Sequence, residues 1–207
     1  MSSQQQGKET KIFISGSLSI DNLAENVTAR LDNIIGSDFL ALVGDAYGID
    51  SSIQKYLKVK SAVNVNIYCA GNNPRNNLGE WDVIPVTTSH KRDTRAFFSA
   101  KDLKMADDCD YGLMIWDSKS TGTLSNVIEL LKRGKKSVVF VNKLKEFVTV
   151  KTVSDLHLLI SKMADGSILQ AEKKINLSEK VSFLEQGQKE MFCLGSGVSS
   201  QHFPKPQ

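Results

Sequence analysis

Small polar residues gather in three segments of this 207-residue chain, and their types suit the binding of phosphate and sugar groups. The richest segment, 117–123, reads DSKSTGT and precedes the apolar pattern of a helix. Backbone N–H groups at the start of a helix attract anions, and hydroxyl groups add hydrogen bonds to them. The alternative is a helix start whose polar residues serve only as caps. The residues expected to line a ligand here are Asp117, Ser120, Gly122 and Thr123.

Two earlier segments follow apolar runs and also contain glycine. Gly16 and Ser17 follow the run KIFIS, and residues 44–50 read GDAYGID. Glycine lets the backbone approach a ligand closely, and free N–H groups ahead of a helix favour an anion. A sugar or base suits Asp45 better than a phosphate does. Asp50 either caps the next helix or accepts a hydrogen bond from a ribose hydroxyl. The candidates in these segments are Gly16, Ser17, Gly44, Asp45, Gly48 and Asp50.

Basic residues lie before or within a helix predicted over 93–108. Arg95 and Lys101 are placed to reach an anionic ligand beside the segment 117–123, although a basic residue on a helix is more often simply solvated. Arg75 lies in the turn-rich segment GNNPRNN, where it either contacts a ligand or orders the loop. Arg95 and Lys101 therefore join the ligand-binding candidates.

Alternating strands and helices must position these segments. Apolar runs predict strands over 11–15, 39–43, 63–69, 111–116 and 138–141, with a minor strand over 83–86. Helical spacing predicts helices over 21–35, 50–58, 93–108, 121–133 and 153–163, with Asp21 and Asp50 as N-caps. A short strand is expected over 190–194. The alternation predicts a Rossmann-like three-layer α/β sandwich with a mainly parallel sheet and a small C-terminal α+β extension. Ligands of such sheets bind beyond the carboxyl ends of the strands.

The length suits one domain with a small appendage. We expect a disordered lead over 1–10, a nucleotide-binding domain over 11–145, an extension over 146–194 that packs on it, and a mobile tail over 195–207.

Composition excludes several classes of protein. The net charge of +3 is too small to indicate nucleic acid or an anionic membrane as a partner. No apolar run approaches the roughly 20 residues that cross a bilayer, and no signal peptide is recognisable. The three cysteines, Cys69, Cys109 and Cys193, have no zinc or disulfide spacing, and Cys69 and Cys109 lie in apolar runs typical of buried thiols. We therefore expect a cytoplasmic protein without a metal or a resident cofactor.

The order of these motifs resembles the SLOG superfamily. VGDAYGID is similar to the GxAxGID stretch of its DNA-processing branch, and STGT is similar to a loop found in that branch and in the lonely-guy phosphoribohydrolases. The resemblance spans roughly residues 11–142 and implies a Rossmann-like nucleotide-binding domain. It implies ligand contacts at Gly16, Ser17, Gly44, Gly48, Ser120, Gly122 and Thr123, and Lys101 stands where the family often has arginine.

The resemblance leaves the activity open because a catalytic residue of the hydrolase branch is missing. The glutamate of its PGGxGTxxE motif corresponds here to Asn126, which is neither an acid nor a base. The first hypothesis is therefore a nucleotide-binding sensor, carrier or regulator. The second is an N-glycosidic hydrolase or deoxyribosyltransferase with an unidentified catalytic residue, and the third is an oligomeric scaffold protein.

Overall fold

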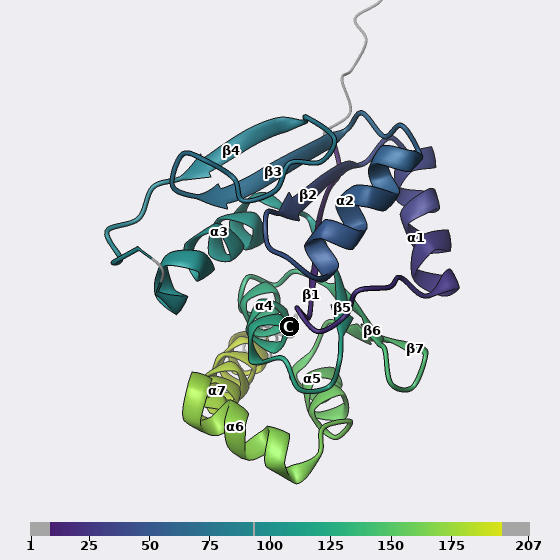
Figure 1. Ribbon diagram of the computed structural model, residues 1–207. Helices are drawn as coiled ribbons and strands as arrows, with labels where there is room; N and C mark the ends of the chain where they lie inside the picture. The colour runs from purple at the N-terminus through teal and green to yellow at the C-terminus, as the bar shows by residue number, and fades with distance from the viewer. Residues whose placement is uncertain (1–8, 93, 196–207) are drawn as a thin grey trace, which may run out of the picture.

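In the described part of the chain, six of the seven strands run parallel, as the alternation of strands and helices predicts. The computed structural model describes residues 9–92 and 94–195. The strands form one sheet in the order β4-β3-β2-β1-β5-β6-β7 (Figure 1). Every neighbouring pair is parallel except β6 and β7. The strands are β1 (Lys11–Gly16), β2 (Leu40–Gly44), β3 (Val65–Ala70), β4 (Asp82–Val86), β5 (Tyr111–Trp116), β6 (Ser137–Val141) and β7 (Glu146–Val150).

Helices cover both faces of the sheet and complete three layers. The helices are α1 (Glu25–Gly36), α2 (Ile49–Val59), α3 (Arg95–Asp108), α4 (Thr121–Lys132), α5 (Val153–Ile160), α6 (Asp165–Ile175) and α7 (Leu177–Gly195). Buried residues of α1 and α2 pack on one face, and those of α3 to α7 pack on the other. Figure 1 shows this division, with α1 and α2 together on one side and α6 and α7 beyond α4. The protein is therefore a Rossmann-like three-layer α/β sandwich.

The alternation of side chains along the strands explains the two cores. In β1, Phe13 packs into the core under α3 to α7, whereas Ile12 and Ile14 pack under α1 and α2. All three side chains are buried, so the strand is apolar throughout. Continuous apolar runs of this kind are what allowed the central strands to be predicted.

The strand order places a switch point between β1 and β5. From β1 the chain moves outward through β2, β3 and β4, and then returns to the other side of β1 as β5. The loops that follow β1 and β5 therefore diverge at the carboxyl edge of the sheet, where open α/β sheets bind their ligands.

Several predicted element boundaries are wrong. α1 begins at Glu25 with Ala24 as its N-cap, and Asp21 lies in the loop before it, where its carbonyl accepts a hydrogen bond from the Ser52 hydroxyl. The N-cap of α2 is Gly48, and Asp50 lies inside the helix. The expected strand over 190–194 belongs to α7. β7, α6 and α7 were not predicted.

Two further predictions can be compared with the structure only in part. Cys69 and Cys109 are buried free thiols, as expected, whereas the side chain of Cys193 lies outside the described part of the chain. The expected disordered lead and mobile tail fall almost entirely on residues 1–8 and 196–207, which also lie outside it.

Candidate functional site at the carboxyl edge of the sheet

A cavity of about 480 Å³ opens at the switch point, between the loops after β1 and β5 and the helix α3. It is lined by eight of the twelve candidate residues: Gly16, Asp50, Arg95, Lys101, Asp117, Ser120, Gly122 and Thr123. The other four candidates, Ser17, Gly44, Asp45 and Gly48, lie behind these residues and position them. A larger hollow, of about 620 Å³, lies at the amino ends of β2, β3 and β4 and includes none of the candidates.

The start of α4 presents free backbone donors to the cavity. Ser120 is the N-cap, and its hydroxyl accepts a 3.3 Å hydrogen bond from the N–H of Thr123. The N–H groups of Thr121 and Gly122 donate no hydrogen bond to any described residue. The capping role and the ligand-binding role predicted for this segment are therefore compatible, since the cap occupies only one of the first N–H groups.

Asp117 shapes the loop ahead of α4. Its Oδ1 accepts hydrogen bonds from the N–H groups of Lys119 at 2.8 Å and Ser120 at 2.7 Å, and its Oδ2 accepts one from the Ser19 hydroxyl at 2.7 Å. Burial raises the pKa of Asp117, but these hydrogen bonds outweigh burial and hold the pKa below its ordinary value. The carboxylate is thus an acceptor already satisfied by the protein, which suits a structural role.

Ser17 ties the two switch-point loops together. It is buried, and its hydroxyl accepts a 3.1 Å hydrogen bond from the N–H of Asp117 and lies 3.4 Å from the Thr123 hydroxyl. It does not line the cavity, so the structure places it in support of the loop after β5.

Three cations surround the start of α4. Arg95, at the first turn of α3, donates hydrogen bonds of 3.3 Å to the Thr121 hydroxyl and the Lys174 carbonyl. Lys119 and Lys174 also line the cavity. In the described part of the chain, none of the three pairs with a carboxylate. Positive charge is therefore concentrated beside the free N–H groups.

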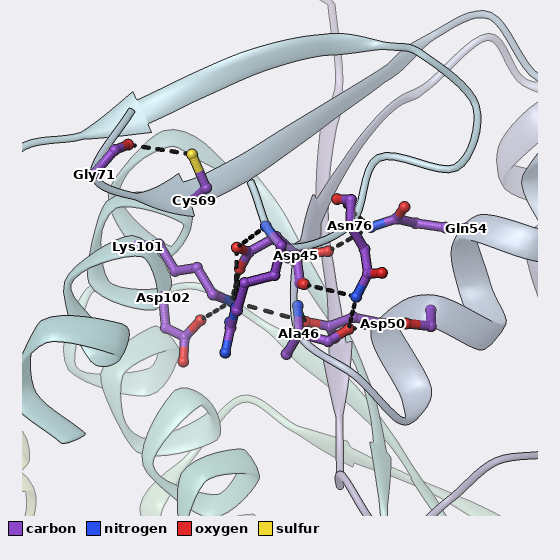
Figure 2. Close-up of polar contacts among 12 residues, drawn as sticks. Asp45, Ala46, Asp50, Gln54, Cys69, Gly71, Asn76, Lys101 and Asp102 are labelled. Atoms are coloured by element: carbon purple, nitrogen blue, oxygen red, sulfur yellow. Dashed lines mark hydrogen bonds and ion pairs between the residues drawn. The ribbon is translucent and has the colours of Figure 1, made fainter. Parts of the chain in front are cut away.

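A buried ion cluster forms a second wall of the cavity (Figure 2). Lys101 of α3 extends towards the end of β2, where its Nζ lies 2.9 Å from Asp102, 3.8 Å from Asp50 and 4.0 Å from Asp45. Asp45 in turn pairs with Arg75 through hydrogen bonds from Nη2 at 2.8 Å, from Nε at 3.1 Å and from the backbone N–H at 3.0 Å. The cluster thus joins α2, α3 and the segment 71–77.

Two glycines make room for this wall. A Cβ at Gly44 would overlap the Asp50 carboxylate and the Lys101 amine, so only glycine lets both groups lie over the end of β2. Gly48 has a φ of 73°, and a Cβ there would overlap the backbone carbonyl of Leu18. Both glycines support the site without lining it.

The charged groups of this cluster differ in how burial and their neighbours shift their pKa values. Burial raises the pKa of Asp50 to about 6, although the charge of Lys101 opposes this shift. Burial alone would lower the pKa of Lys101, but Asp102, Asp50 and Asp45 together raise it, so its ammonium stays charged. Asp45 is also buried, yet its bonds from Arg75 outweigh burial and hold its pKa below its ordinary value. Asp50 thus titrates closer to neutral pH than Asp45 does.

Sequence reasoning missed part of the lining. Lys174 belongs to α6, and no local pattern connects that helix to the earlier loops. Asp102 and Phe98 flank Lys101 on α3 and also line the cavity. Arg75 was left with two roles, and the structure leaves both open. It orders its loop through Asp45 and also lines the cavity, with its guanidinium 4.4 Å from the centre of the Phe98 ring.

No protein-family model matches the chain, and a search of curated proteins finds no significant match. Among the described residues, no helix is long and apolar enough to cross a membrane, and no group of His, Cys, Asp and Glu side chains is arranged to hold a metal ion. The fold and the position of the cavity define a Rossmann-like α/β protein with a charged cavity at its switch point.

Proposed function

We propose that the protein binds a nucleotide or a nucleotide-derived small molecule in this cavity, as a sensor, carrier or regulator, with the phosphate at the start of α4. The observation that carries the proposal is the concentration of Arg95, Lys119 and Lys174, without carboxylate partners in the described chain, around free N–H groups. Cations and the positive end of a helix act together on a phosphate, because each of its oxygens accepts several hydrogen bonds.

The size of the cavity supports a small molecule rather than a polymer. Small-molecule sites span about 300 to 1,000 Å³, and this cavity of about 480 Å³ lies within that range. Phe98 and the exposed Leu18 add apolar surface to the lining, which a base or a sugar ring can contact. The resemblance of VGDAYGID and STGT to SLOG proteins supports the same class of ligand.

A thermal unfolding panel tests the proposal. The purified protein is heated with nucleoside mono-, di- and triphosphates, with nucleosides, and with inorganic phosphate. A ligand at 100 times its Kd should stabilise the folded protein by about 2.7 kcal/mol. We expect at least one nucleotide to raise Tm, and its nucleoside to raise Tm less. Nucleosides that stabilise as well as nucleotides, or a panel without any stabilising compound, would contradict a phosphate site.

A second candidate function is N-glycosidic hydrolysis or transfer, and the observation that favours it is Asp50. Its carboxyl group is 3% exposed and lines the cavity, and a pKa raised to about 6 suits proton transfer near neutral pH. Asn126 also lines the cavity but supplies no proton chemistry. Chromatography for free base after incubation with nucleosides and nucleotides tests this candidate. Release of base by the parent protein but not by Asp50→Asn would support it.

A further inference from the structure

We propose that Asp50 and Lys101 together recognise a ribose hydroxyl, so that the cavity selects ribonucleotides over nucleotides that lack both the 2′- and 3′-hydroxyl groups. The inference rests on the proposed function and assigns the two ends of the ligand to two different parts of the cavity lining. The phosphate belongs to the wall of Arg95, Lys119 and Lys174, and the sugar belongs to the wall of the ion cluster.

The spacing of the pair carries this assignment. The Oδ2 of Asp50 and the Nζ of Lys101 are 3.8 Å apart, which is too far for a hydrogen bond although both side chains are only 4% exposed. The single hydrogen bond to the Asp50 carboxylate from the described residues comes from the N–H of Ala46, at a long 3.3 Å. Lys101 donates one hydrogen bond, to Asp102. Both groups thus line the cavity with unused hydrogen-bonding capacity.

A hydroxyl group fits this pair because it donates and accepts at once. It can donate to the Asp50 carboxylate and accept from the Lys101 ammonium, which satisfies both buried groups. A second anion is disfavoured by Asp50 and Asp102. A cationic amine is disfavoured because Lys101 and Arg75 already lie in the cluster. A neutral group with both hydrogen-bonding functions is therefore the best partner, and a ribose supplies two of them.

The test compares matched pairs of probes by calorimetry at neutral pH. AMP, GMP, CMP and UMP are each titrated against their 2′,3′-dideoxy counterparts, using the parent protein, Asp50→Ala and Asp50→Asn. Asp107→Asn is the control, since Asp107 lies in the last turn of the same helix, pairs with Arg133 and does not line the cavity. Circular dichroism confirms that each variant is folded. If Asp50→Ala does not fold, Asp50→Asn keeps the side-chain volume and provides the comparison.

We expect the parent to bind at least one ribonucleotide about tenfold or more tightly than its dideoxy counterpart, as for a hydrogen bond to a charged group. The Asp50 variants should lose most of this preference and keep their affinity for the dideoxy probe, while Asp107→Asn should retain the preference. Equal affinity of the parent for both members of every bound pair would overturn the inference and leave the proposed function standing. So would a preference that persists in both Asp50 variants, or one that Asp107→Asn also removes. Binding of none of the probes would overturn the proposed function and the inference with it.

Discussion

Replacing Gly122 by aspartate should abolish ligand binding while leaving the fold intact. Gly122 is the second residue of α4 and lines the cavity beside the free N–H groups. A Cβ at this position would meet only the Ser120 hydroxyl oxygen, at 3.8 Å, so the backbone accepts a side chain. The introduced carboxylate would satisfy the N–H groups that we assign to the phosphate.

The size of the effect follows from charge and distance. A carboxylate about 5 Å from a dianionic phosphate, at an effective dielectric constant of about 20, is repelled by roughly 6 kcal/mol. Screening by water and salt reduces this repulsion. Even about a third of it, roughly 2 kcal/mol, would weaken binding roughly 30-fold. The same carboxylate interacts favourably with the helix dipole, so the free energy of unfolding should stay constant or rise by about 0.5 kcal/mol.

The chain offers a matched control at Gly166. This residue is likewise the second residue of its helix, α6, and a Cβ there meets nothing within 4 Å. It does not line the cavity. Calorimetric titration with the best nucleotide of the thermal panel should show parent-like affinity for Gly166→Asp and a loss of at least about 30-fold for Gly122→Asp. Parent-like binding by Gly122→Asp would refute the placement of the phosphate at α4.

Three further predictions concern the support of the site. Gly48→Ala should lower the free energy of unfolding, measured by urea denaturation, by about 1 to 3 kcal/mol, because Gly48 has a positive φ. Gly36→Ala is the control and should not lower it, since a Cβ at Gly36 would meet no neighbouring atom within 4 Å. Arg75→Ala should cost about 3 kcal/mol in the same assay, because the buried carboxylate of Asp45 loses its bidentate partner, and a cost under about 0.5 kcal/mol would contradict this. The pKa of Asp50 is raised from 3.8 to about 6, so the folded state binds the proton of Asp50 more tightly than the unfolded state does. The protonated carboxyl therefore stabilises the folded state below about pH 4, and this stabilisation is lost as pH rises through 6. The parent should therefore lose on the order of 3 kcal/mol of unfolding free energy between pH 4 and 7, and Asp50→Asn should not show this loss. The same pH profile of stability in the parent and in Asp50→Asn would argue against the shifted pKa.

The central sheet was predictable because its strands are buried on both faces. Residues such as Ile12, Phe13 and Ile14 all enter a core, so the strand appears as an unbroken apolar run. β7 has no such signal, since it is an edge strand whose residues alternate in exposure and include Glu146 and Thr149. The apolar run at 190–194 is equally compatible with a strand or a helix, and its place in α7 depends on the residues before it.

The candidate site was predictable where loops follow strands and less so where distant helices meet them. The spacing of glycines and hydroxyls predicted the loop after β5, because the carboxyl ends of parallel strands share one edge. The pairing of Asp45 with Arg75 had no local signal, since 30 residues separate them. Lys174 reaches the cavity only because α6 packs against α4, which is a tertiary contact that no local pattern contains.

The outer strand β4 has a consequence for how copies of this protein meet. Among the described residues it pairs with β3 and with Gly71 directly after that strand, so its other side offers backbone groups to an extended chain. Pro85 lies within this strand and has no N–H to donate, and prolines in sheets occur where the missing donor would face outward. A second chain that added to this edge would lack a hydrogen bond at that point. Pro85 thus disfavours the addition of further strands to this edge, which is the route by which exposed sheet edges lead to aggregation.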